Sequence, residues 1–467
     1  MFLNIDKHLK SRIAVKDNEE HTLSYAELTK IVQVTAELVL PRSVIFILCK
    51  NTVGCLIGYL GFIEGNSVPL MLSSKIDNEF FNSLSEKFQP AYLWVPSEHI
   101  HKFDYEVLFE KFGYSLLATN RPCYPIHEQL QLLMTTSGST GSPKLVRYKK
   151  GNLEANAKNV AKAFGWTANE RPICDLGMQY TMGLNVINSH LYAGASVLLT
   201  TYNLMDSNFW DYAKSEKATN FTGVPFSYDI LWRLHFDRMD LPYLRTLSQG
   251  GGKLTDIRFR ELAEYAQNNG KRFIASFGTT ETSARMACLP PETALSKIGS
   301  IGKAIPEGEL FLVDNNGNVL TEPESEGELC CRGPNVTMGY ALNKTDLLRS
   351  DDFCGEYHTG DLARRDSDGY YYIIGRKSRF LKLLSYRISL DQCEKLIQEH
   401  FNIECICIGT DQRMDIFITK SDIKDNLIEF VSDKTNLYKS LFKVHITDVL
   451  PRKESGKINY DGLKNYE

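Results

Sequence analysis

The chain has 467 residues, 43% hydrophobic and 24% charged, a composition typical of globular proteins with room for one large and one small domain. With 53 basic and 57 acidic side chains the net charge is −4, so nothing indicates a nucleic-acid or anionic-membrane partner. The longest apolar stretch, 53–63, is too short to span a membrane, and residues 1–12 lack the apolar core of a secretory signal. The 11 cysteines show neither C-x-x-C spacing nor an even framework, so we expect a reduced, cytoplasmic protein.

The first part of the chain alternates between strand-like and helix-like segments. Apolar runs at 43–49, 67–72 and 91–95 predict strands, and apolar residues at helical spacing in 52–64 and 77–87 predict helices between them. Helical crossovers between strands are typical of parallel sheets. We therefore expect a mainly parallel sheet with helices on both faces.

The alternation continues to about residue 277, and the pattern then changes. Strands are expected at 173–176, 195–199, 218–221, 246–249 and 272–277, with helices at 184–192 and 255–268 and Thr255 as a helix N-cap. Later segments predict short strands at 310–313, 327–332 and 370–374, then a module with a helix at 390–399 and strands at 404–408 and 414–419. The expected fold class is α/β, with a large N-terminal domain of mainly parallel αβα layers plus a small β-barrel-like part, followed by a small α+β C-terminal domain.

The segment 132–147, LLMTTSGSTGSPKLVR, indicates a phosphate-binding loop. A short apolar run precedes a stretch of hydroxyl and glycine residues that ends at Pro143 and Lys144. Glycines let successive backbone N–H groups face an anion, hydroxyls add uncharged donors, and Lys144 supplies a positive charge. The same composition also suits a flexible linker. A Walker loop is excluded, because no glycine lies five residues before a Gly-Lys-Ser/Thr triplet.

Four further polar segments each have a functional and a structural interpretation. FGTTE at 277–281 offers an aromatic face and a carboxylate for Mg²⁺, or only a helix cap. The triple glycine 250–252 indicates a turn or a close backbone approach to a ligand. YHTGDL at 357–362 could bind ribose hydroxyls through its aspartate, or only form a turn. PRKESGK at 451–457 could bring a lysine to a developing charge on phosphorus, or be solvated surface.

Six segments in a fixed order resemble the acyl-adenylate-forming superfamily, which comprises acyl- and aryl-CoA synthetases, adenylation domains of nonribosomal peptide synthetases and beetle luciferases. They are TTSGSTGSPK, QGGGKL, FGTTE, GELCCRGPNVTMGY, YHTGDLARRDSDGYYYIIGRKSRFLK and PRKESGKIN, within about 132–460. The resemblance implies that residues 1–377 bind ATP and the acid, while residues 378–467 form a lid that carries the catalytic lysine. It also implies a reaction in two steps. A carboxylate attacks the α-phosphate of ATP to give acyl-AMP and pyrophosphate, and a thiol then takes the acyl group.

The resemblance assigns roles to individual positions of this sequence. The catalytic residues would be Lys457, Glu281 and Thr280, with Glu281 also binding Mg²⁺ and Ser378 as the hinge of the lid. Nucleotide-binding residues would be Thr136, Ser137, Gly138, Ser139, Thr140, Gly141, Lys144, Gly251, Gly252, Ser276, Phe277, Gly278, Thr279, Asp361 and Arg376. Tyr180, Thr181, Asn185, Val224 and Phe226 would line the acid pocket. All of these are expectations from motif position.

Three departures from the family pattern affect the expected chemistry. Phe277 replaces the usual tyrosine, Leu145 follows the loop lysine where glycine is common, and Ser385 stands where glycine normally lies beside the thiol tunnel. Thr181 occupies the position at which amino-acid-activating domains place an aspartate. Because an α-ammonium group would be desolvated there without a partner, α-amino acids are disfavoured.

The sequence therefore predicts an AMP-forming ligase for a small carboxylic acid, using ATP and Mg²⁺. The acceptor would be coenzyme A or the phosphopantetheine arm of a separate acyl carrier protein. The alternative is a catalytically degenerate nucleotide-binding protein with a regulatory role, which would have no need of Lys144, Glu281, Asp361 and Lys457 together. A kinase or ATPase would require the Walker loop that is missing.

Overall fold

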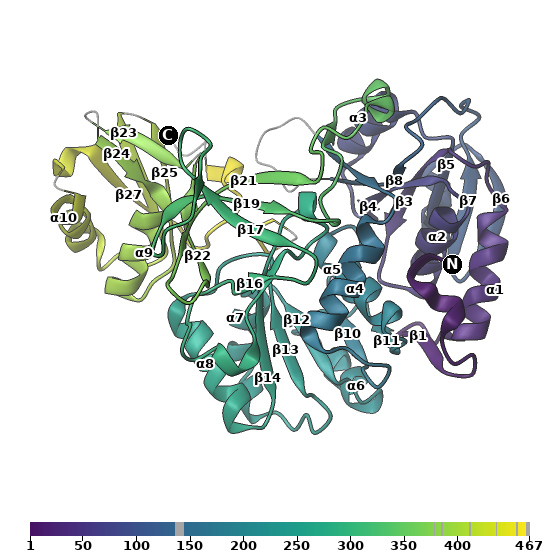
Figure 1. Cartoon of the computed structure of the whole chain (residues 1–467), viewed down its shortest axis with the longest axis horizontal. Coiled ribbons are helices and arrows are strands. Elements are labelled where there is room, and N and C mark those ends of the chain that lie inside the picture. The colour runs from purple at the N-terminus through teal and green to yellow at the C-terminus, as the bar shows by residue number, and fades with distance from the viewer. Residues whose placement is uncertain are drawn as a thin grey trace. The chain divides into compact units, whose positions relative to one another are not determined.

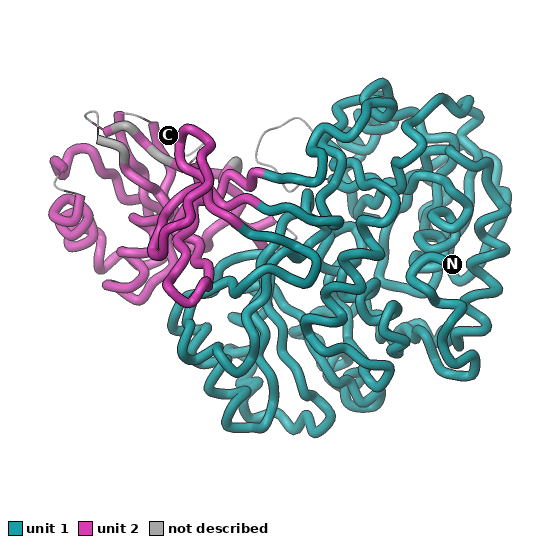
Figure 2. Tube along the Cα trace, viewed as in Figure 1, with its two compact units in different colours: residues 1–310, 331–357 teal, residues 311–330, 358–467 magenta. Residues whose placement is uncertain are grey.

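The structure is a computed structural model that describes residues 1–135, 144–377, 379–383, 386–410, 412–435, 437–453 and 456–463. It contains two compact units (Figure 2). Unit 1 comprises residues 1–310 and 331–357, and unit 2 comprises residues 311–330 and 358–467. The expected domain boundary between residues 377 and 378 stays a prediction.

Unit 1 contains two large sheets whose central strands are parallel (Figure 1). The first has the order β20 (Tyr340–Ala341), β9 (Leu145–Lys149), β8 (Leu130–Thr135), β4 (Val68–Ser73), β3 (Val44–Cys49), β5 (Tyr92–Pro96), β7 (Tyr114–Ala118) and β6 (Glu106–Lys111). Strands β8, β4, β3 and β5 are parallel, and the strands beyond them on both sides are antiparallel. The expected parallel arrangement is confirmed for the centre of the sheet.

The second sheet of unit 1 carries most of the later strands. Its order is β16 (Lys303–Ala304), β15 (Ala287–Cys288), β14 (Arg272–Phe277), β13 (Thr246–Gln249), β12 (Asn220–Gly223), β10 (Pro172–Cys174), β11 (Val197–Leu199), β1 (Ile13–Asp17) and β2 (Thr22–Ser24). The pairing is parallel from β14 to β1. The N-terminal strand β1 thus joins a sheet whose other parallel strands come much later in the chain.

Alternating side chains of β3 show how the layers form. Ile45 and Ile47 belong to the same buried core as α1 (Tyr25–Ala36), α2 (Val53–Glu64), α4 (Asn152–Phe164) and α5 (Thr181–Tyr192). The intervening residues, such as Phe46, pack instead with α3 (Asn78–Phe88). Alternate residues of β3 thus pack into two different cores, one on each face of the sheet. Because both faces are buried, the strand is apolar throughout.

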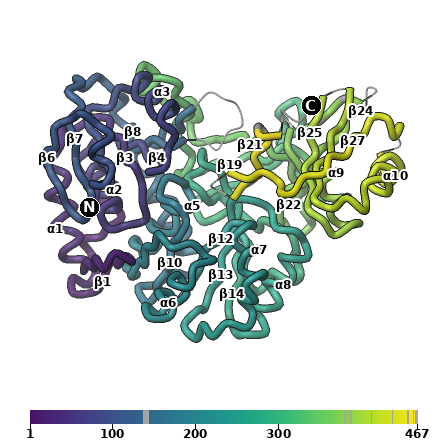
Figure 3. Tube along the Cα trace, turned by 180° about the vertical axis from the view of Figure 1, so that it is seen from behind, coloured from purple at the N-terminus to yellow at the C-terminus, as the bar shows by residue number. Residues whose placement is uncertain are grey.

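The other helices of unit 1 are α6 (Ser207–Ser215), α7 (Pro225–Arg233) and α8 (Asp256–Asn268), seen beside the second sheet in Figure 3. The side chain of Thr255 accepts a hydrogen bond from the Arg258 backbone N–H, so the expected N-cap of α8 is confirmed. No helix within the described residues is long and apolar enough to traverse a bilayer.

Unit 2 is built on smaller sheets. One has the order β18 (Val319–Leu320), β17 (Glu309–Val313), β19 (Glu326–Arg332), β21 (Glu356–Arg365) and β22 (Tyr371–Arg376). The first two residues of β17 and of β21 and the last two of β19 belong to unit 1. The others are β23 (Phe380–Leu383) with β24 (Tyr386–Ser389), and β25 (Cys405–Thr410), β26 (Arg413–Ile418) and β27 (Phe442–Ile446). Helices α9 (Leu390–Phe401) and α10 (Lys424–Thr435) share a buried core with β25, β26 and β27.

Candidate active site

The FGTTE segment forms a tight turn at the end of β14. Residues Thr280–Thr282 make one 3₁₀ turn, and Ser283 and Ala284 follow with φ of 58° and 89°. The chain returns so closely that a Cβ at position 278 would lie 1.9 Å from the Ala284 carbonyl oxygen. Only glycine fits at position 278, because any side chain would collide with backbone.

A second segment, residues 335–340, holds this turn in place. The Thr337 N–H donates to the Glu281 carbonyl at 3.0 Å, and the Asn335 side-chain amide donates to the Thr282 carbonyl at 2.8 Å. The Tyr148 hydroxyl donates to the Thr280 carbonyl at 2.6 Å. These bonds satisfy the backbone acceptors of the turn and hold its backbone in place. The hydroxyl and carboxylate side chains therefore extend from a fixed backbone.

Tyr340 connects the carboxylate of this turn to the loop lysine. Its hydroxyl donates to Glu281 Oε1 at 2.7 Å, and Lys144 Nζ lies 3.9 Å from the centre of its ring. Burial, together with the negative charge of Glu281, raises the pKa of the Tyr340 hydroxyl, which therefore stays a donor. The structure thus brings together two residues that motif spacing placed far apart, and it adds Tyr340, which the sequence analysis did not single out.

The triple-glycine turn lies beside the expected acid pocket. Gln249 closes it by donating to the Gly252 carbonyl at 2.6 Å, and the Ser276 hydroxyl donates to the Gln249 carbonyl at 2.7 Å. Gly251 has φ of 76°, and a Cβ there would lie 3.1 Å from Val224 Cγ1. Glycine is required by this left-handed backbone, and the turn brings Val224 next to it.

The other expected pocket residues lie at the starts of two helices. Tyr180 is the N-cap of α5 and Thr181 its first residue. Val224 is the N-cap of α7, and Phe226 is the second residue of that helix. Thr181 and Asn185 line a small cavity with room for about one water molecule, together with Leu132, Tyr148, Leu153, Asn156, Leu184, Asn188 and Ser283. Asn185 is buried and donates to the side-chain oxygen of Asn156 at 2.5 Å.

A buried arginine in this region was not anticipated. Arg285 donates through Nη1 to the side-chain oxygen of Asn185 and through Nε to the Ser276 hydroxyl at 3.2 Å. Its guanidinium also lies 4.9 Å from the centre of the Phe164 ring. Burial lowers the pKa of Arg285 to about 10, so it is a cation at neutral pH. The available signal was a lone arginine in the otherwise apolar run ARMACL, directly after the FGTTE turn.

In unit 2, strand pairing brings Asp361 and Arg376 together. They face each other across β21 and β22, and Arg376 Nε donates to Asp361 Oδ1 at 2.8 Å. Burial raises the pKa of Asp361, while the charges of Arg376 and Lys457 act in the opposite direction. The charge of Asp361 is the main cause of the raised pKa of Arg376.

Lys457 lies at the end of a short hairpin in unit 2. Arg452 and Ile458 form an isolated antiparallel bridge, and the Lys453 N–H donates to the Lys457 carbonyl at 2.8 Å. Lys457 itself is exposed. Several other expected site residues lie outside the described residues: Thr136, Ser137, Gly138, Ser139, Thr140 and Gly141 of the loop, Ser378 of the hinge, and Ser385.

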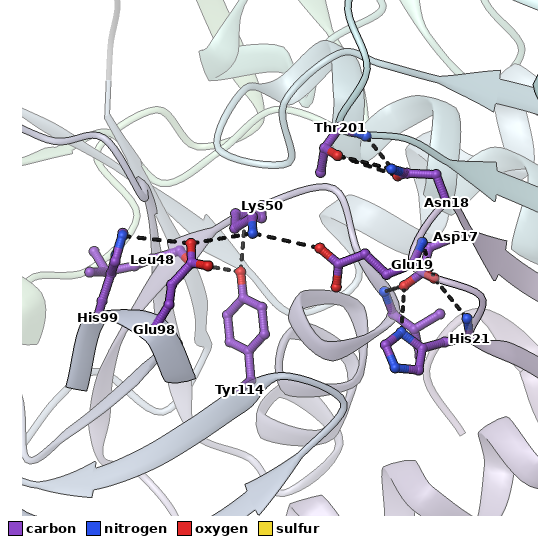
Figure 4. A network of polar contacts seen from close by, with 11 residues as sticks. Asp17, Asn18, Glu19, His21, Leu48, Lys50, Glu98, His99, Tyr114 and Thr201 are labelled. Carbon is purple, nitrogen blue, oxygen red and sulfur yellow. Dashed lines mark hydrogen bonds and ion pairs between the residues drawn. The ribbon is translucent and has the colours of Figure 1, made fainter. Parts of the chain in front are cut away.

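A separate polar cluster surrounds Asp17 (Figure 4). Within the described part of the chain, Asp17, Glu19 and His21 form the one group of three potential metal ligands whose donor atoms lie within 4.8 Å of one another. The buried Asp17 carboxylate already accepts backbone N–H bonds from Glu19, His21 and Val53 at 2.8 to 3.1 Å. Its geometry explains how the β1–β2 turn is attached to the start of α2.

Comparison with known proteins now identifies the class. Residues 4–341 match the family model described as "AMP-binding enzyme", so the chain belongs to that family. It is 30% identical over 346 residues to the oxalate–CoA ligase of Arabidopsis thaliana, covering 70% of this chain and 65% of that protein. A 2-succinylbenzoate–CoA ligase of Bacillus mycoides is 29% identical, covering 71% of this chain and 69% of the relative.

Solved structures agree with this family. The o-succinylbenzoate CoA synthetase from Bacillus subtilis, in complex with its acyl-adenylate intermediate, superposes with a TM-score of 0.80 at 22% identity, covering all of this chain and 98% of the other. The same enzyme in complex with ATP and a magnesium ion gives a TM-score of 0.78, covering 99% and 98%. The expected fold class and superfamily are confirmed. The chain is an enzyme of the AMP-forming acid–CoA ligase class, and the regulatory alternative is not favoured.

Proposed function

We propose that this chain activates a carboxylic acid as acyl-AMP at the expense of ATP, with release of pyrophosphate, and then transfers the acyl group to a thiol. The observation that carries the proposal is the contact chain from Lys144 through the Tyr340 ring to the buried Glu281 carboxylate. A positive charge and a hard oxygen ligand thus both contact one tyrosine side chain, an arrangement that suits a triphosphate with its metal ion.

The residues of unit 1 are assigned to the phosphates, the base and the acid. Lys144 and the loop 136–141 would hold the β- and γ-phosphates, and Phe277 would stack near the adenine. Thr280 and Glu281 offer a hydroxyl and a carboxylate, ligand types that fit Mg²⁺. When bound, Mg²⁺ would neutralise phosphate charge. The backbone around the nucleotide would be shaped by Gly251, Gly252, Ser276, Gly278 and Thr279. The acid would be surrounded by Tyr180, Thr181, Asn185, Val224 and Phe226.

The residues of unit 2 are assigned to the ribose and to the first chemical step. Asp361, oriented by Arg376, would accept hydrogen bonds from the ribose hydroxyls. Lys457 would stabilise the charge that develops between the attacking carboxylate and the α-phosphate. Ser378 would be the hinge of a lid comprising residues 378–467.

Coenzyme A is the favoured acceptor, because the relatives are named as CoA ligases. A separate acyl carrier protein is the second candidate. The relatives are named for different acids, so their names do not identify the acid that this chain activates. A cytoplasmic location is part of the proposal. It is supported by free cysteines buried in apolar cores, namely Cys49, Cys55, Cys174 and Cys407.

Carboxylate-dependent exchange between ATP and labelled pyrophosphate tests the proposal. A panel of aliphatic, aryl, dicarboxylic and amino acids should reveal a subset that supports exchange, with amino acids inactive. Coenzyme A should then consume the adenylate and form a thioester. Tight ATP binding without exchange on any acid would overturn the proposal and support the regulatory alternative.

A further inference from the structure

Arg285 is a buried cation with no counter-charge among the residues that the structure describes. The residue is 1% exposed, and its protein acceptors are the neutral oxygens of Asn185 and Ser276. Its Nη2 is buried and has no hydrogen-bond acceptor among the described residues. The described residues also place no carboxylate within ion-pair distance of its guanidinium. A buried charge without a counter-charge is strongly unfavourable, and proteins normally pair it.

Another arginine shows how the same unit neutralises such a charge. Arg147 is equally buried, and its guanidinium donates to four backbone carbonyls and to the carboxylate of Asp352 at 2.7 Å. Arg147 is thus paired within the protein. Each arginine keeps one buried N–H without an acceptor among the described residues, Nε in Arg147 and Nη2 in Arg285. The difference is that no described carboxylate pairs with Arg285, and an unpaired buried cation with a free N–H is the condition expected of a side chain that receives an anion.

The position of Arg285 indicates which anion this is. Its two protein acceptors are both expected site residues. Asn185 lies in the wall of the cavity that begins at Thr181, and Ser276 lies at the end of β14 against the Gln249 turn. The Arg285 guanidinium therefore lies at the expected acid pocket. It contacts Asn185 and Ser276, whereas Lys144 and Glu281 contact Tyr340.

We propose that Arg285 binds a second carboxylate of the substrate, so that the enzyme's substrate is a dicarboxylic acid. This inference rests on the proposed function. One carboxylate is adenylated, and the other forms an ion pair with Arg285, supported by the neighbouring Asn185 amide. The same cation repels an α-ammonium group, which strengthens the case against α-amino acids that Thr181 first suggested.

The test compares each diacid with its own monoamide, since this pair differs mainly in the distal charge. Aliphatic and aromatic diacids are assayed by ATP–pyrophosphate exchange in the full-length enzyme. The wild type should use the best diacid about 10²- to 10³-fold more efficiently, in kcat/KM, than the monoamide, because a buried charge pair is lost with the amide. Arg285→Gln should bring this ratio close to one, and Arg285→Lys should restore part of it.

Arg272→Gln is the matched control. Arg272 is the first residue of β14, the strand that contains Ser276. It donates to the Thr246 hydroxyl and the Phe164 carbonyl, and its guanidinium lies near the Trp166 ring. Arg272→Gln removes a guanidinium group, as Arg285→Gln does, but this group does not contact Asn185 or Ser276. The diacid-to-monoamide ratio should stay at the wild-type value in this variant.

A binding measurement provides a readout that does not need turnover or a variant. With a non-hydrolysable ATP analogue present, the diacid should raise the melting temperature of the wild type more than its monoamide does. Exchange with monoamides or monocarboxylic acids in preference to diacids would overturn the inference alone. An unchanged ratio in Arg285→Gln, or equal melting shifts in the wild type, would do the same. Absence of exchange with every acid would overturn both this inference and the proposed function.

Discussion

The Tyr340 side chain contacts both Glu281 and Lys144, the first through its hydroxyl and the second through its ring. The hydroxyl donates to Glu281, and the ring faces the Lys144 ammonium. The first contact orients a carboxylate, and the second attracts a cation through the ring quadrupole. The two contributions can be separated, because a phenylalanine retains the ring and removes only the hydroxyl.

Tyr340→Phe should reduce the free energy of unfolding by about 2 kcal/mol, the range for a hydrogen bond to a charged group. Its pyrophosphate exchange should fall because Glu281 is less well oriented. Tyr340→Leu should lower exchange further, since Lys144 also loses its ring contact. Urea unfolding and exchange kinetics check both effects. Equal activity of the two variants would show that the ring contact has no role.

His190 contributes a pH dependence to stability. Its Nδ1 lies 2.7 Å from the Val186 carbonyl, which can only accept, so the proton is on Nδ1 and Nε2 accepts from the Asn220 amide at 3.1 Å. Burial lowers the pKa of His190 to about 4 from 6.5, with the charge of Arg285 acting in the same direction and that of Glu170 against it. The folded state therefore requires the neutral ring.

The free energy of unfolding should accordingly fall as the pH drops from 6.5 to about 4, because only the unfolded chain takes up this proton in that window. The difference of 6.5 − 4 = 2.5 pKa units corresponds to about 3 kcal/mol. His190→Asn should have a flatter profile in urea titrations at a series of pH values. The exposed His101→Asn serves as the control and should retain the wild-type slope. Parallel profiles for His190→Asn and the wild type would refute the assignment.

At the scale of elements, several of the expected site residues lie where β12, β13 and β14 end. Their parallel pairing brings Val224, the Gly250–Gly252 turn and the Gly278–Thr282 turn to the same edge of the second sheet. This is where ligands of parallel α/β sheets are generally found. The two turns differ in whether they can accept a side chain in place of a glycine. Gly278 faces the backbone of Ala284, whereas Gly250 faces the flexible side chain of Met182.

Gly278→Ala should prevent the FGTTE turn from forming, since the added methyl would lie 1.9 Å from the Ala284 carbonyl oxygen. We expect a loss of several kcal/mol in stability and no exchange activity. Gly250→Ala is the matched comparison. Its methyl would meet the end of the Met182 side chain at 2.8 Å and the Ser276 hydroxyl at 3.0 Å, so this variant should fold and accept a narrower range of acids. Thermal denaturation with the acid panel distinguishes the two outcomes, and a fully active Gly278→Ala would contradict them.

At the scale of the whole molecule, the expected functional residues are divided between the two units. Lys144, Thr280 and Glu281 lie in unit 1, whereas Asp361, Arg376 and Lys457 lie in unit 2. The proposed reaction has two steps, and Lys457 is assigned only to the first. That division can be tested by supplying the intermediate directly.

Lys457→Ala should lower pyrophosphate exchange by at least about 10²-fold, the loss typical of removing a group that stabilises transition-state charge. Thioester formation from chemically prepared acyl-AMP and coenzyme A should remain close to wild type. Lys443→Ala, at an exposed position of β27, is the control for a general loss of positive charge. Equal impairment of both half-reactions by Lys457→Ala would show that the lysine is not specific to adenylation.

The sequence by itself determined the local elements and the chemical class. Strand and helix periods depend on the immediate neighbours, so β13 and β14 have the expected bounds and α8 begins after its predicted cap. The order of six motifs was sufficient to indicate an adenylate-forming enzyme, because each motif carries its own donor or acceptor groups at fixed spacing.

Only the tertiary structure decided which distant segments meet. An apolar strand has the same pattern whichever sheet it joins, so the parallel pairing of β1 with β11 could not be predicted from the residues. The contact of Lys144 with Tyr340 depends on packing between segments far apart in the chain. So does the burial of Arg285 with no carboxylate beside it in the described part of the chain. Spacing along the sequence indicates the expected reacting groups, whereas the surroundings of Arg285, on which the proposed dicarboxylic substrate rests, arise only from packing in three dimensions.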